Sequence, residues 1–221
     1  MQNTSKTIYS HLHQTADVGD VEGVKNCLSS GLVATAQDDE GRTPLHYALR
    51  LPIVYTDDQK NHAIAIAHLL ILSAPETLLI KDKAGDSPVH LMAANDAFLD
   101  LLQDALKRYP KLAKETNNDG VSPIHIAIAR QQPKTQSYLL SQEGMRHLVD
   151  LNGNTLLHHA VMMNNANCVK ELLDNSDHLN LKAENRAGQT ALDLNLMNHL
   201  SLEIKSLLEN SNEGQTCHRA F

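Results

Sequence analysis

The chain has 221 residues, of which 42% are hydrophobic and 20% charged, a composition typical of folded proteins and not of disordered ones. Its 19 lysines and arginines stand against 26 acidic residues, so the formal charge is -7 and we expect no nucleic-acid partner. Aromatic residues make up only 3%, which argues against a surface that stacks bases. The longest apolar run, residues 63–72, contains His68 and has half the length of a membrane crossing, so we expect no membrane insertion.

The N-terminus and the cysteines indicate the cellular compartment in which the protein acts. Residues 1–14 contain one lysine and lack the apolar run that a signal peptide needs. Three cysteines, Cys27, Cys168 and Cys217, lie far apart and are odd in number, which fits a reducing environment. We therefore expect an intracellular, cytoplasmic protein, and we expect it to be a monomer.

A short motif recurs five times: Asp/Asn-x-x-Gly-x-Thr/Ser-Pro-aliphatic-His. The copies begin at Asp38, Asp82, Asn117, Asp150 and Asn185, and their glycines are 44, 35, 33 and 35 residues apart. The first side chain and the glycine predict a tight turn. The Thr or Ser predicts a helix N-cap, and proline fits the first helical position because it lacks only an N–H that would be unpaired there.

A second helix is predicted in each unit. It ends in paired leucines, at residues 69–70, 101–102, 139–140, 172–173 and 207–208. Because neither short helix can bury its apolar face alone, we expect the units to stack. The aliphatic residues of the motif should then form a continuous buried row: Leu45, Val89, Ile124, Leu157 and Leu192.

Two segments depart from this pattern. The first glycine spacing exceeds 33 by eleven residues, and the excess falls around residues 51–60. We expect Pro52 to end the first helix and residues 51–62 to form an enlarged loop before the second. Residues 211–221 are polar and lack periodicity, so a disordered tail is expected there.

The motif varies along the chain in a recognisable way. It is Thr-Pro-Leu-His at 43–46, Ser-Pro-Val-His at 87–90 and Ser-Pro-Ile-His at 122–125; the copy at 155–158 lacks the proline, and the copy at 190–193 lacks both proline and histidine. This signature resembles that of the ankyrin repeat family, and residues 16–31 resemble a degenerate first repeat. Decay toward both ends is expected of capping repeats, whose outer faces meet water.

The resemblance implies an all-α fold, an ankyrin repeat solenoid of stacked helix-turn-helix units joined by β-turn or hairpin loops. It implies one domain at residues 1–210, followed by the tail at 211–221. The repeats would lie at about residues 8–37, 38–81, 82–116, 117–149, 150–184 and 185–210.

Thirteen histidines raise the question of a metal site. Four of them, His46, His90, His125 and His158, fall one per layer, and layers about 8–10 Å apart cannot converge on an ion that needs ligands at about 2 Å. The resemblance implies instead that they tie adjacent turns by hydrogen bonds. His11 and His13 flank the first helix, and a surface ion there is the weaker alternative. We expect no metal and no cofactor.

The sequence lacks the common motifs of catalytic sites. Cys27 and Cys168 fall in second helices, where burial is expected, and the sequence has no Gly-rich phosphate loop, His-Glu-x-x-His or Gly-x-Ser-x-Gly. The chain is therefore predicted not to be an enzyme. The alternative is a hydrolase or metal-dependent activity at the 51–62 insertion, with His62 or His68 as the base.

The resemblance also implies a protein-binding surface, the concave face formed by the turn tips and the exposed ends of the first helices. By position, the candidates are Asp39, Glu40, Arg42, Lys83, Asp86, Asp119, Val121, Leu151, Asn152, Asn154, Met162 and Met163. The four apolar members suggest a contact patch, because turn tips are usually polar. The alternative for either methionine is that it packs inward.

These observations predict a non-catalytic scaffold that binds another protein through its concave face. Ankyrin-only proteins of this size occur in eukaryotic signalling and among effectors that intracellular bacteria deliver into host cells. The irregular repeats, the insertion and the polar tail favour an effector, which would be secreted without a classical signal peptide.

Overall fold

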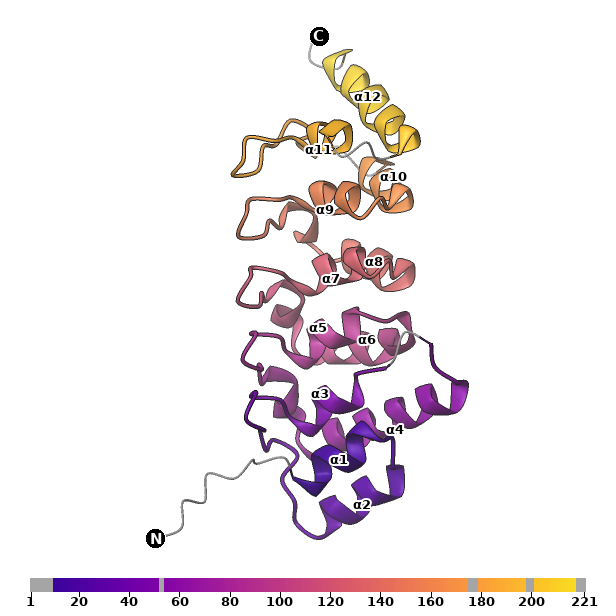
Figure 1. Ribbon diagram of the computed structural model, residues 1–221, viewed down its shortest axis with the longest axis vertical. Coiled ribbons are helices and arrows are strands. Elements are labelled where there is room, and N and C mark those ends of the chain that lie inside the picture. Colours follow the sequence, from indigo (N-terminus) through magenta and orange to yellow (C-terminus); the bar gives the residue numbers. More distant parts are fainter. Residues whose placement is uncertain (1–9, 52–53, 175–178, 198–200, 218–221) are drawn as a thin grey trace. The chain divides into compact units, whose positions relative to one another are not determined.

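The computed structural model describes residues 10–51, 54–174, 179–197 and 201–217. These ranges are helical, and the only β pairing within them is one isolated antiparallel bridge between Val149 and Thr155. The chain divides into two compact units, Met1–Asn118 and Asp119–Phe221 (Figure 1). Each unit is described by itself below.

The first unit contains three helix pairs. The first helices of the pairs, α1, α3 and α5, pack against one another in order, and α2 packs against α4 (Figure 1). Short 3-10 helices follow α4, α5 and α6. The bounds are α1 His11–Asp17, α2 Val21–Ser29, α3 Pro44–Ala48, α4 Asp57–Ser73, η1 Pro75–Leu79, α5 Pro88–Ala93, η2 Asp96–Phe98, α6 Leu99–Arg108 and η3 Pro110–Lys114.

The second unit repeats the arrangement. Its first helices, α7, α9 and α11, pack in order, and α10 contacts both α8 and α12. The bounds are α7 Pro123–Ala129, α8 Pro133–Leu140, η4 Met145–His147, α9 Leu156–Met162, α10 Ala166–Asp174, α11 Ala191–Met197 and α12 Leu202–Cys217. The fold is therefore all-α, as the sequence predicts.

The recurring motif forms the start of each first helix. Thr43, Ser87, Ser122 and Thr155 are N-caps, and the histidine three residues later closes a capping box with each. The backbone N–H of the cap residue donates to histidine Nδ1 at 3.1–3.2 Å in all four. The other ring nitrogen reaches the next repeat where His46 Nε2 lies 3.2 Å from Asp86 O and His158 Nε2 2.9 Å from Gln189 O. His46 and His158 thus join adjacent turns by hydrogen bonds.

The first repeat begins with the same capping box, which contradicts the weaker alternative of a surface ion held by His13. Ser10 is the N-cap of α1 and His13 closes its capping box. The His13 side chain is buried, and its Nε2 lies 3.0 Å from Arg42 O. Only His11 is exposed. The Ser-x-Leu-His spacing at residues 10–13 thus acts as the repeat signature without its proline.

The predicted buried row is confirmed in four of its five positions. Leu45, Val89, Ile124 and Leu157 are at most 1% exposed. The fifth, Leu192, is only half-buried, whereas its neighbour Ala191 is buried. Within the described ranges no further first helix follows α11, which packs against α12 instead, and in this arrangement Leu192 keeps part of its surface exposed.

The insertion differs from the loop expected at residues 51–62. Helix α3 already ends at Ala48, and Pro52 lies outside the described residues. Thr56 caps α4: its hydroxyl accepts from Gln59 N at 3.2 Å, and Gln59 Oε1 accepts from Thr56 N at 2.9 Å. Because of this capping box, residues 57–62 extend α4, and only the residues from 49 to 56 connect the two helices.

The C-terminal segment also differs from expectation. Helix α12 continues to Cys217, past Asn210 and through most of the stretch predicted as a disordered tail. Its first half is fixed by burial of Ile204 and Leu208. Once a helix is nucleated, each added residue gains one backbone hydrogen bond, so polar residues can prolong it. Residues 218–221 lie outside the described residues.

Candidate functional site

The hairpin tips share one local structure. In the first unit, Asp38 Oδ1 accepts from the N–H groups of Glu40 and Arg42 at 2.9 and 2.8 Å, and Gly41 adopts a positive φ of 75°. The same pair of bonds is made by Asp82 in the first unit and by Asp150 and Asn185 in the second. The first residue of the motif therefore holds each tip in a fixed turn.

Successive tips are joined by backbone hydrogen bonds. Lys83 N donates to Glu40 O at 2.9 Å and Asn118 N to Ala84 O at 3.0 Å in the first unit, and Arg186 N donates to Asn152 O at 2.8 Å in the second. In the second unit, the side chain of Gln189 also contacts Met197 Sδ at 3.2 Å, which places the end of α11 beside a tip. We call the tips and the C-terminal ends of the first helices the hairpin face of each unit.

The hairpin face of the first unit is charged. Asp39, Glu40 and Lys83 are exposed, and the Lys83 ammonium lies 3.6 Å from Glu40. Arg42 is half-buried: it pairs with Asp38 at 2.9 Å and lies 4.9 Å from the centre of the Tyr47 ring. Its main contacts are therefore internal.

Asp38 is the centre of that internal network. Its Oδ2 accepts from the Tyr47 hydroxyl at 2.6 Å. Burial acts to raise the pKa of Asp38, but the hydrogen bonds from Tyr47, Arg42 and Glu40 outweigh it and lower this pKa to about 2. Asp86 is likewise half-buried and accepts from Asn117 Nδ2 at 2.9 Å. Of the charged candidates in this unit, Asp39, Glu40 and Lys83 remain available to a partner.

The hairpin face of the second unit is more apolar. Leu151 is 51% exposed and Met163 37%, and Met197 at the end of α11 is 64% exposed. Met162 is half-buried, which separates the two methionines that the sequence could not tell apart. Asp119 and Asn152 are exposed, and Val121 is half-buried.

The position of Leu151 follows from Gly120. A Cβ at residue 120 would lie 2.7 Å from Leu151 Cγ, so only glycine lets the leucine lie over this turn. Leu151 is thereby held against the backbone with half of its surface still exposed. An apolar side chain that is fixed and exposed is suited to contact another surface.

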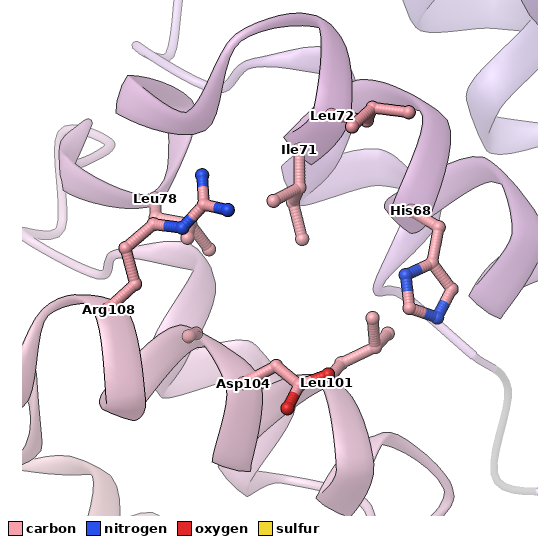
Figure 2. Close-up of a pocket in the computed structure, with 8 residues that line it drawn as sticks. His68, Ile71, Leu72, Leu78, Leu101, Asp104 and Arg108 are labelled. Carbon is pink, nitrogen blue, oxygen red and sulfur yellow. The ribbon is translucent and has the colours of Figure 1, made fainter.

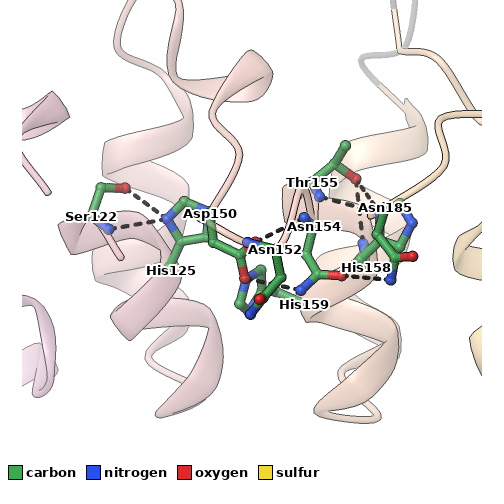
Figure 3. Close-up of polar contacts among 9 residues, drawn as sticks. All are labelled: Ser122, His125, Asp150, Asn152, Asn154, Thr155, His158, His159 and Asn185. Atoms are coloured by element: carbon green, nitrogen blue, oxygen red, sulfur yellow. Dashed lines mark hydrogen bonds and ion pairs between the residues drawn. The ribbon is translucent and has the colours of Figure 1, made fainter. Parts of the chain in front are cut away.

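Asn154 was predicted to lie on the binding surface, and the structure buries it. It is 7% exposed; its Nδ2 donates to Asp150 Oδ2 at 2.9 Å and its Oδ1 accepts from Asn185 Nδ2 at 2.9 Å (Figure 3). It therefore links two neighbouring tips and is not a contact residue. Figure 3 shows that His159, from α9, reaches the same carboxylate; its Nε2 lies 3.0 Å from Asp150 Oδ2.

A second histidine lies beside His159. The rings of His125 and His159 are in edge contact with centroids 4.7 Å apart, and His125 Nε2 has no hydrogen-bond partner among the described residues. Burial lowers the pKa of His125 to about 4, and the charge of His159 acts in the same direction. Burial also lowers the pKa of His159, against the attraction of Asp150. Both imidazoles are consequently neutral at pH 7.

Comparison with known proteins identifies the fold. A family model described as "Ankyrin repeat" matches residues 152–184. An ankyrin repeat domain from Acinetobacter baumannii AYE is similar in structure, with a TM-score of 0.70 and 25% identity over 91% of this chain and 97% of that one. This chain belongs to the ankyrin repeat family.

Two further likenesses are to proteins of other descriptions. The human "Transient receptor potential cation channel subfamily A member 1" is 33% identical over 156 residues, which are 69% of this chain and 12% of that protein. A chain from the complex of a predatory endopeptidase with an immunity protein, from Bdellovibrio bacteriovorus, has a TM-score of 0.71 and 24% identity over 94% and 99% of the two chains. This ankyrin chain spans 12–32% of the length of the first curated relatives.

The group formed by Ser122, His125 and His159 contains the atom types of a hydrolytic site, but a substrate could not reach them. Ser122 Oγ lies 2.8 Å from His125 Nδ1, as a nucleophile lies from its base. However, Ser122 is fully buried, and Nδ1 also accepts the Ser122 backbone N–H, so the pair caps α7 and faces no solvent. No group of three His, Cys, Asp or Glu side chains in the described ranges could hold a metal ion.

The insertion offers no better arrangement. His62 and His68 are exposed on α4, and in the described ranges no carboxylate or hydroxyl hydrogen-bonds to either ring to orient it as a base. Cys27 and Cys168, on second helices, are buried as predicted. Within the ranges described, no helix has both the length and the apolar composition needed to span a bilayer.

The Cys168 thiol is predicted to be inert in the folded protein. Burial raises its pKa from 9.0 to about 12, and nearby Glu171 acts in the same direction. Because the thiolate is the reactive form, iodoacetamide should label Cys168 about a thousandfold more slowly in the native protein than in urea at pH 8. Mass spectrometry of the labelled peptides measures the ratio. Equal rates in the two states would mean that the thiol is accessible and that the buried position is wrong.

Proposed function

We propose that this ankyrin repeat protein is a non-catalytic scaffold that binds another protein through the hairpin face, the concave face of the family. Ankyrin repeats are in general protein-interaction modules, and one similar chain comes from a complex with an immunity protein. The observation that carries the proposal is the exposed apolar group Leu151, Met163 and Met197 on the hairpin face of the second unit. Burying these side chains would remove apolar surface from water, at about 25 cal/mol per Å².

The finer parts of the proposal concern where the scaffold acts. We place it inside a cell as a monomer, and the irregular repeats support a role as an effector that a bacterium delivers into a host cell. The partner is a protein whose contact surface presents apolar side chains to the second unit. Asp39, Glu40 and Lys83 on the first unit would contribute charge recognition and a faster encounter.

The test is a double substitution, Leu151→Asp with Met163→Asp. Partner capture from host lysate, read by cross-linking mass spectrometry, should fall about tenfold or more, because each new carboxylate would have to be desolvated against an apolar surface. Stability should change by only about 0.5 kcal/mol per site, since both side chains are on the surface.

Leu202→Asp is the matched control. Leu202 is 83% exposed on α12 and lies in the same unit, so its replacement adds the same charge away from the hairpin face. Undiminished capture by the double variant would refute a site at Leu151 and Met163. If capture also falls with rising salt, the charged tips at Asp39, Glu40 and Lys83 carry the binding instead.

A further inference from the structure

The first unit has a groove on its second helices, away from the hairpin face. Figure 2 shows Ile71 of α4 pointing into it, with His68 at one end and Arg108 of α6 at the other. Leu78 and Leu101, which are 0% and 4% exposed, form the floor. Leu72 stands at the rim and is 81% exposed.

The size of the groove limits what it can hold. Its free volume is about 160 Å³. An apolar cavity of about 150 Å³ accepts a benzene ring, so the groove is large enough for one leucine or phenylalanine side chain but not for a cofactor. The apolar floor and Leu72 favour such a side chain over a polar ligand.

The charge beside the groove is opposite to that of the whole chain. The chain carries a formal charge of -7, yet Lys107, Arg108, Lys111 and Lys114 place four exposed cations at the end of α6 and along η3. Cations in the last turn of a helix stabilise it, which accounts for Lys107 and Arg108 but not for the two lysines beyond α6.

These cations are mostly not neutralised within the protein. Lys107 pairs with Asp104 at 3.0 Å. No ion pair engages Arg108, Lys111 or Lys114 in the part of the chain that the structure describes. The groove is lined by the Asp104 carboxylate, which Lys107 neutralises, and by Arg108, and Lys111 and Lys114 follow Arg108 along the chain. An apolar floor with this excess of cations is complementary to a ligand with an apolar side chain and carboxylates next to it.

We propose that this groove binds an acidic amphipathic peptide segment of a partner protein. One leucine or phenylalanine of the segment enters between Ile71 and Leu101, and aspartates or glutamates within a helical turn of it face Arg108 and Lys111. This site uses α4 and α6 and is separate from the hairpin face, so either proposal can fail without the other.

The probe is a fluorescein-labelled helical peptide of about 15 residues with one phenylalanine at its centre and glutamates within one turn of it. Fluorescence anisotropy with the full chain should show saturable binding that weakens with salt. One control peptide replaces the phenylalanine by serine and a second replaces the glutamates by lysine. Each control should bind at least about tenfold more weakly than the probe.

Charge reversal gives the sharpest result. Arg108→Glu with Lys111→Glu should weaken binding of the glutamate probe about tenfold or more and strengthen binding of the lysine version. The matched control is Lys170→Glu with Lys182→Glu, which reverses two exposed lysines in the second unit. Leu72→Asp should also weaken the glutamate probe, whereas Val18→Asp, at a side chain 70% exposed in the same unit, should not.

Three outcomes would overturn the proposal. The first is equal binding of the serine control peptide, and the second is wild-type affinity of the charge-reversal variant for the glutamate probe. The third is self-association that Leu72→Asp abolishes, measured by light scattering, because it would assign the groove to a second copy of the chain. Circular dichroism of every variant verifies that a loss of binding is not a loss of folding.

Discussion

Ile124→Ala is expected to lower the free energy of unfolding by about 2–5 kcal/mol, as large-to-small changes in a packed core do. Ile124 is 0% exposed and lies on α7, which packs against both α8 and α9. Alanine would leave a cavity that two neighbouring helices border. Because each repeat in such a stack is stabilised mainly by its neighbours, the loss is not confined to α7.

The control for this change lies two residues away on the same helix. Ile126 is only half-buried, so Ile126→Ala removes the same atoms but less buried surface, and it should cost less than half as much. Urea titration followed by circular dichroism measures both variants. Equal losses, or a melting temperature of Ile124→Ala within a degree or two of wild type, would show that the buried row is assigned to the wrong face.

The repeats can be predicted from the sequence because the same few residue types form the turn and the helix start in each of them. Asp38, Gly41 and Thr43 act through bonds between residues two to four positions apart, and such local chemistry can be inferred without tertiary information. The buried row follows from the same register. It fails at Leu192 on α11, which packs against α12 and not against a further first helix in the described ranges.

The elements that were missed have local signals too. Ser10 and His13 form a repeat start with the usual spacing but without proline, so a search that requires the full signature passes over them. Thr56 and Gln59 are a capping box, which predicts that a helix begins inside the insertion. These two local signals account for the burial of His13 and for the extension of α4 into the insertion.

The candidate surface was harder to predict, because exposure depends on neighbours that are distant in sequence. Asn154 is at a tip by its position in the motif, yet Asp150 and Asn185 bury it. Met162 and Met163 are equivalent in the sequence, and only the packing of α9 exposes Met163 more. The groove beside Arg108 joins α4 to α6, about forty residues apart, and no motif marks it.

Acid is expected to destabilise the protein before its carboxylates titrate. His125 Nδ1 accepts the Ser122 N–H, so the neutral ring carries its proton on Nε2, and adding a second proton at Nδ1 would break the capping box of α7. The folded-state pKa of about 4 lies below the ordinary 6.5, so the unfolded chain takes up protons first as the pH falls. The stability that this neutral histidine supplies is therefore full above pH 6.5 and is lost between pH 6.5 and 4.

The expected loss from His125 is on the order of 3 kcal/mol over that range, since one pKa unit corresponds to about 1.4 kcal/mol. His13, His46 and His159 act in the same direction, because burial lowers the pKa of each. Asp150, the acidic group that faces His159, has a lowered pKa despite its burial because Asn154 donates hydrogen bonds to it, so its contribution is lost only below pH 3.8. Urea titrations at pH 7.5, 6.0 and 5.0 should show a steady fall in stability.

The decisive comparison is the slope of stability against pH in His125→Gln. This variant can keep the capping box of α7, but it should be less stable at pH 7.5 because it loses the ring contact with His159 and buries an amide group without a full set of partners. Its stability should nevertheless fall less on acidification than that of the wild type. His147→Gln removes an exposed histidine from η4 and is the matched control. A His125→Gln slope equal to that of the wild type would mean that His125 takes up its proton as readily in the folded as in the unfolded chain. In that case burial and the neighbouring His159 would not hold the ring neutral, and the acid sensitivity would have to come from His13, His46 or His159.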